Sequence, residues 1–146
     1  MNEDEKWMKI AINEANLANN ENEIPVGAVL IKNGKIIAKA HNQPISKNDP
    51  TAHAEIQVLR LAGKKLENYR LTNTILYVTL EPCQMCFGAM MHARVKRIVY
   101  GADDTKKNKC GTCEDLKNTK HQIEITSGIL QNDCSEILKK FFNLRR

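Results

Sequence analysis

The sequence lacks the features of an exported or membrane-inserted protein. Its first residues, MNEDEKWMKIAINEA, are acidic and mixed, without the basic start and apolar run of a signal peptide. No uninterrupted apolar stretch approaches the roughly 18 residues that a membrane-spanning helix needs. We therefore expect a cytoplasmic protein, whose cysteines stay reduced and whose cysteine pairs serve metal binding or catalysis.

The sequence also lacks internal repeats, low-complexity linkers and an even number of cysteines. Its 146 residues, 42% of them hydrophobic and 27% charged, are typical of one globular chain with a full core, so we expect a single domain over residues 1–146. The five cysteines cannot complete a disulfide framework.

Charge is distributed unevenly along the chain. Residues 1–23 hold six acidic and two basic residues, although the whole chain has a net charge of +5. The remainder is therefore strongly basic, with clusters at 94–97, 106–109 and 139–146. Such clusters are compatible with an ordinary solvated surface and with a polyanionic partner such as nucleic acid.

Periodicity and turn signals predict a series of alternating elements. Helical spacing of apolar residues predicts four helices, over 4–20, 51–66, 83–94 and 134–146. Thr51 is the expected N-cap of the second of these. Apolar runs around Asn33-Gly34 predict a hairpin, and further strands are expected at 73–80, 95–102 and 121–128, with a loop over 43–50. This order indicates an α/β fold with a mixed five-stranded sheet flanked by helices.

Two Cys-x-x-Cys pairs, Cys83/Cys86 and Cys110/Cys113, raise three possibilities. A thioredoxin-like redox pair would need no metal. That motif usually opens a helix after the first strand of its unit, however, and here the pair comes late in the chain. A four-cysteine zinc ribbon would join both pairs, but the residues between them contain a strong strand. The third possibility adds His53 as a ligand.

His53 and Glu55, in the sequence HAE, give the third possibility its chemistry. His-x-Glu followed by Pro-Cys-x-x-Cys is the signature of zinc-dependent nucleobase deaminases. His53, Cys83 and Cys86 would leave the fourth position of a tetrahedral Zn²⁺ open for water, which zinc converts to hydroxide near neutral pH. Glu55 would transfer protons beside the metal. His53 and Cys83 are both expected in first helical turns, facing one pocket.

The segments PVGAVLI, DPTAHAEIQVLR, LYVTLEPCQMCFGAMMHARVKRIVYGADD, ITSGIL and FFNLRR resemble those of the bacterial tRNA-specific adenosine deaminases. The resemblance implies a three-layer α/β/α cytidine-deaminase-like fold, one zinc ion per chain, a homodimer, and conversion of adenosine to inosine at the wobble position of a tRNA anticodon stem-loop. It also implies that Asn42 hydrogen-bonds the flipped base and that Asp104, Phe142 and Arg145 approach the RNA. Zinc-bound hydroxide would attack C6 of adenine.

Two alternative functions stay open. A deaminase of small molecules, of the guanine or cytidine type, would share all four catalytic residues. A non-catalytic zinc-ribbon module would bind RNA through both cysteine pairs. Aromatic residues for base stacking are few: Phe87 and Phe142 are candidates, and Phe141 is expected in the core.

Overall fold

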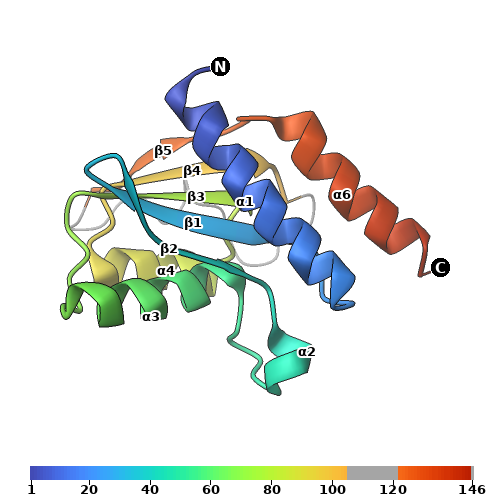
Figure 1. Ribbon diagram of the computed structural model, residues 1–146, viewed down its shortest axis with the longest axis horizontal. Helices are drawn as coiled ribbons and strands as arrows, with labels where there is room; N and C mark the ends of the chain where they lie inside the picture. Colours follow the sequence, from blue (N-terminus) through green and yellow to red (C-terminus); the bar gives the residue numbers. More distant parts are fainter. Residues whose placement is uncertain (105–121, 146) are drawn as a thin grey trace.

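The computed structural model describes residues 1–104 and 122–145 (Figure 1). Its strands are β1 (Gly27–Lys32), β2 (Lys35–His41), β3 (Thr74–Leu80), β4 (Arg97–Ala102) and β5 (Glu124–Thr126). They form a sheet in the order β2-β1-β3-β4-β5. β1 is antiparallel to β2 and β3, whereas β4 pairs in parallel with both β3 and β5. The predicted mixed five-stranded sheet is confirmed.

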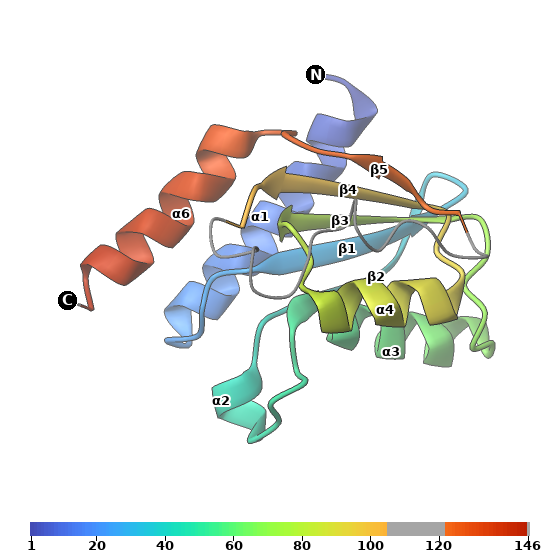
Figure 2. The same ribbon diagram turned by 180° about the vertical axis from the view of Figure 1, so that it is seen from behind.

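Helices cover both faces of this sheet (Figures 1 and 2). α1 (Glu3–Asn20) and α6 (Gln131–Asn143) lie on one face, and α3 (Ala54–Leu66) and α4 (Gln84–Ala93) lie on the other. The short helix α2 (Pro44–Lys47) stands beyond the sheet, between β2 and α3. The arrangement confirms the three-layer α/β/α fold. Within the described residues, no helix combines the length and the apolar character needed to cross a membrane.

The core follows the two-residue period of the strands, because successive side chains of a strand point to opposite faces. Leu30, Leu76 and Ile98 pack under α3 and α4, together with Val58, Phe87 and Met90 from these helices. The neighbouring residues Val29, Tyr77 and Val99 face α1 and α6, where they meet Trp7, Met8, Ala11 and Cys134. Phe87 and Phe141 are both buried, so the expected core position of Phe141 is confirmed and Phe87 is packed in the core as well.

The hairpin between β1 and β2 turns at the predicted dipeptide. Asn33 has φ 52° and Gly34 has φ 73°. Positive φ at both central residues is what a type I′ turn requires, and Asn-Gly is the sequence that best tolerates it.

Asp4 ties the first helix to two strands directly and to a third through Arg97. Arg97 donates from Nη1 to Asp4 Oδ1 at 2.9 Å and from Nη2 to Asp4 Oδ2 at 2.8 Å. The hydroxyl of Tyr77 donates to the same Oδ1 at 2.8 Å, and Arg97 Nη2 also donates to Thr126 Oγ1 at 2.9 Å. This cluster fixes α1 against β3, β4 and β5.

Two predicted local features are wrong. Thr51 is not the N-cap of α3, which begins at Ala54. Its amide and hydroxyl donate instead to Asp49 Oδ1, at 2.9 and 2.7 Å, in a turn before the helix. The segment predicted as a loop over 43–50 contains α2, which has Pro44 at its first position.

Candidate metal centre and active site

The site begins where two helices start. His53 is the N-cap of α3 and Cys83 is the N-cap of α4, so both lie one position before the helical turn in which they were expected. Neither makes a side-chain capping hydrogen bond. Cys86 is in the first turn of α4. Because β3 ends at Leu80, α4 starts at the carboxyl end of β3, and α/β folds commonly bind ligands beyond the carboxyl ends of their parallel strands.

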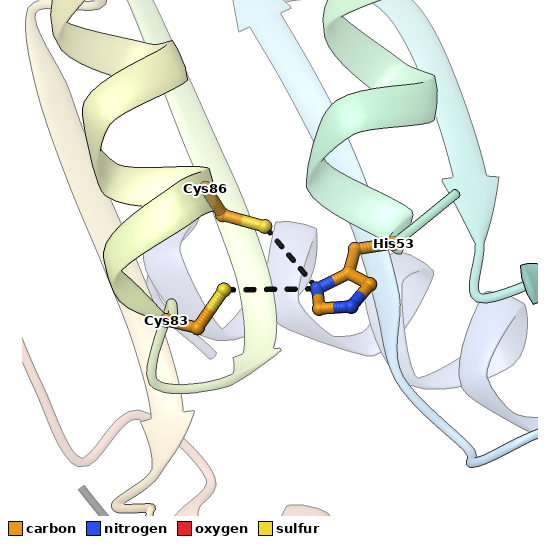
Figure 3. A group of neighbouring side chains, drawn as sticks. All are labelled: His53, Cys83 and Cys86. Carbon is orange, nitrogen blue, oxygen red and sulfur yellow. Dashed lines mark hydrogen bonds between the residues drawn. The ribbon is translucent and has the colours of Figure 1, made fainter. Parts of the chain in front are cut away.

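The three side chains converge on one point (Figure 3). His53 Nδ1 lies 3.7 Å from Cys83 Sγ and 3.4 Å from Cys86 Sγ, and all three atoms lie within 4.8 Å of one another. Zn–S bonds of about 2.3 Å and Zn–N bonds of about 2.0 Å at tetrahedral angles place sulfur and nitrogen about 3.5 Å apart. The side chains therefore fit a tetrahedral zinc ion with a fourth position left for another ligand.

Hydrogen bonding within this group favours a thiolate. The bond from Cys86, assisted by His53 and opposed by burial, lowers the pKa of Cys83 to about 4. The same bond raises the pKa of Cys86, so the pair holds one proton at neutral pH. The hydrogen bond to Cys83 also raises the pKa of His53. Since metals bind thiolates, ligation by both sulfurs releases the remaining proton.

Glu55 lies in the first turn of α3, two residues after His53, and is only 4% exposed. Burial raises the pKa of its carboxyl to about 7, although a backbone hydrogen bond and the charge of His53 oppose that rise. Cys86 is close enough to hydrogen-bond to it. A buried carboxyl beside a metal-binding group is the arrangement used for proton transfer in hydrolytic sites.

Known deaminases are similar to this chain over nearly its whole length. A model of the cytidine and deoxycytidylate deaminase zinc-binding region matches residues 1–102. The tRNA-specific adenosine deaminase of Buchnera aphidicola subsp. Schizaphis graminum is 47% identical, over 99% of this chain and 97% of that protein. The chain belongs to the cytidine and deoxycytidylate deaminase family.

Solved structures add two relatives of this deaminase. A structure from work on A-to-I editing by tRNA:A34 deaminases superposes with a TM-score of 0.85 at 41% identity, covering 91% of this chain and 99% of that one. A guanine deaminase from Bacillus subtilis superposes with a TM-score of 0.68 at 42% identity, covering 80% of this chain and 74% of that one. Both structures share the fold of this chain, but the first is named for deamination of tRNA and the second for deamination of guanine.

Asn42 of the deaminase is buried and directly follows β2, which ends at His41. Its Oδ1 accepts from the backbone amide of Ala54 at 3.1 Å, so this side chain satisfies an amide at the start of α3 that His53 does not cap. Ala54 N–H uses one lone pair of the Asn42 oxygen, and the amide nitrogen is the donor that this side chain would offer to a base. Its role toward the base stays a prediction.

Asp104 is held at the end of β4 by a residue that the sequence did not single out. Glu81, 5% exposed, accepts from Asp104 N at Oε1 over 3.2 Å, and its own amide donates to Ala102 O at 2.8 Å. The only sequence signal was an acidic residue directly before Pro82 and the thiols. Cys110 and Cys113 lie outside the described residues.

Phe142 is in the last turn of α6 and Arg145 follows that helix by two residues. α6 covers the sheet face opposite α3 and α4 (Figure 1). Phe142 is 43% exposed and meets Phe141 edge-on, with ring centroids 5.3 Å apart. The guanidinium of Arg145 lies 3.6 Å from the ring centroid of Phe141 and donates to Asn22 Oδ1 at 3.1 Å. These two residues are therefore not part of the group around His53.

Proposed function

We propose that this deaminase converts adenosine to inosine at the wobble position of a tRNA anticodon. The proposal is carried by the combination of the His53, Cys83, Cys86 and Glu55 arrangement with near-full-length similarity to tRNA-specific adenosine deaminases. His53, Cys83 and Cys86 are the proposed ligands of one zinc ion, and Glu55 is the proposed acid–base group. A tRNA substrate would place the enzyme in the cytoplasm, and we further propose a homodimer.

The proposed reaction adds water at C6 of adenine and releases ammonia. Zinc, when bound, would polarise a water molecule and lower its pKa toward neutrality. Glu55 is buried next to the ligands, where it would accept one proton of that water and pass it to the ring. It would then take the second proton from the oxygen added at C6 and pass it to the departing amine. Because bulk water is excluded from a carboxyl that is 4% exposed, those protons stay within the site.

The base must leave its stack to reach this buried site, which costs less in a single-stranded anticodon loop than in a duplex. Asn42 would then donate from its amide nitrogen to the base while its oxygen still accepts from Ala54. Asp104, Phe142 and Arg145 are the proposed contacts to the surrounding RNA. Exposed lysines of α6, Lys139 and Lys140, are available for phosphates.

The test compares an anticodon stem-loop carrying adenosine at the wobble position with free adenosine, cytidine and guanine. We expect inosine in the stem-loop to form far faster than any free base or nucleoside is deaminated. RNA binding should weaken with salt at a log–log slope near −0.7 per phosphate contact in single-stranded segments. Lys139→Ala with Lys140→Ala should flatten that slope.

Asn42→Asp tests base recognition without disturbing α3. The variant keeps an oxygen for Ala54 and removes the amide donor, so deamination should fall while the salt slope stays unchanged. A normal rate in this variant would exclude the proposed contact.

Guanine deaminase activity is the second candidate, favoured by the 42% identity with the Bacillus subtilis guanine deaminase. Guanine processed as fast as the stem-loop, without salt dependence, would establish it and reject the tRNA substrate.

A further inference from the structure

Glu23 is a buried carboxylate that lies outside the metal group, in the turn after α1. It is 1% exposed. Its Oε1 accepts from the backbone amide of Ile45 at 3.2 Å, and its Oε2 accepts from the amide of Ser46 at 2.7 Å and from the Ser46 hydroxyl. Both oxygens are therefore occupied by donors from a single short segment, α2.

The backbone of Glu23 is fixed to the rest of the fold. Its amide donates to Ala18 O at 2.9 Å, after Asn22 with φ 62°, which closes the end of α1 in the manner of a Schellman motif. Three residues later, Val26 O accepts from Asn42 N at 3.0 Å. The carboxylate thus extends from the hydrogen-bonded end of α1 to residues 43–52, which contain no strand of the sheet.

The segment that Glu23 holds, residues 43–52, connects two residues of the site. It leaves Asn42 and ends at His53, and Gln43 N donates to Ala52 O at 3.0 Å across its base. Figure 2 shows α2 projecting at the end of the molecule where α3 and α4 begin. Ile45, on α2, is 71% exposed. Displacement of this segment would therefore change the surface that meets a substrate at the mouth of the site.

Glu23 has the charge state that this role requires. Burial alone would raise the pKa of its carboxyl, but the hydrogen bonds from Ser46 and Ile45 outweigh burial and lower the pKa below its ordinary value. An ionised carboxylate accepts at both oxygens and donates from neither, which matches three donors.

We propose that Glu23 is a positioning residue that holds residues 43–52 in the conformation that accepts the RNA substrate. This role rests on the proposed deamination of a tRNA anticodon. Glu23 touches neither the metal ligands nor the reacting base. It acts by keeping α2 and the two flanking site residues in register before substrate arrives.

The test compares Glu23→Gln with Glu67→Gln, an equal change at an exposed position at the other end of α3. Glutamine keeps the shape of glutamate, but its amide nitrogen must face one of the backbone donors that the carboxylate accepted. If the competent conformation falls to about a tenth of the population, KM for the stem-loop rises about tenfold, whereas kcat at saturation stays within about twofold. Zinc content should stay at one per chain, and Glu67→Gln should behave as the natural protein.

Hydrogen exchange at the Ile45 and Ser46 amides gives a readout that needs no activity. We expect exchange at least about tenfold faster in Glu23→Gln than in Glu67→Gln, because these amides lose their acceptor. Unchanged exchange would overturn the proposal, and so would a loss of kcat with KM unchanged. If the natural protein left the stem-loop unmodified, the proposed function would fail, and the exchange rates would still decide whether Glu23 holds the segment.

Discussion

Replacing Asp4 with alanine should lower the free energy of unfolding by about 3 kcal/mol. The variant removes three acceptor contacts at once: two from Arg97 and one from the hydroxyl of Tyr77. Tyr77 is 1% exposed, and an unpaired buried hydroxyl costs roughly 1–3 kcal/mol. The side chain of Arg97 is 23% exposed and keeps Thr126, so its loss is discounted to about 1–2 kcal/mol from the roughly 3–5 of a fully buried pair.

Urea unfolding at fixed protein concentration measures this difference, and Trp7 is the probe. It is the single tryptophan, is buried in α1 and lies three residues from Asp4. Asp103→Ala, at an exposed position, serves as the control for loss of one carboxylate. A decrease below about 1 kcal/mol, or an equal decrease in the control, would refute the reasoning.

The Asp4 contribution should also depend on pH. Arg97 lowers the pKa of Asp4 below its ordinary value of 3.8, through hydrogen bonds that outweigh burial. As the pH falls, Asp4 therefore takes up a proton in the unfolded state before it does so in the folded state. The stabilisation is fully present above the ordinary value and is lost as the pH falls through the lower folded-state value, so the difference between natural protein and Asp4→Ala should shrink in acid.

Two further predictions concern the metal centre. Glu55→Gln should keep one zinc per chain and the fold but lose deamination by about 10²–10⁴, the usual range for an acid–base group; near-normal turnover with metal bound would remove Glu55 from the mechanism. Cys110→Ala with Cys113→Ala should leave the zinc content unchanged, whereas His53→Ala should lower it; the opposite result would establish the zinc ribbon.

The sequence predicts features that depend on residues close together in the chain. The strands and the hairpin turn of the sheet are examples. Asn33-Gly34 specifies its turn by backbone preference alone, and the two-residue period of β3 and β4 follows from burial. The grouping of His53 with Cys83 and Cys86 was also predicted, because the His-x-Glu and Pro-Cys-x-x-Cys motifs each lie at the start of a predicted helix.

Features that depend on contacts between distant residues were not predicted. Thr51 has the chemistry of an N-cap, but Asp49 takes its hydroxyl and Asn42, twelve residues before Ala54, supplies the acceptor. Glu23 and Glu81 are single acidic residues that sequence patterns assign to the surface. Their burial depends on donors more than twenty residues away, which no local pattern reveals.

The start of both α3 and α4 at the metal centre has a consequence for charge. Two thiolates and a neutral imidazole around Zn²⁺ would carry no net charge, so the ligands cancel the ion. The amino ends of the two helices, each equivalent to roughly half a positive charge, would then lie beside the base, together with the Glu55 carboxyl in the first turn of α3. As water adds to the purine ring, electron density accumulates on its nitrogens, in the field of both helices. A third thiolate in place of His53 would make the centre anionic and oppose that accumulation.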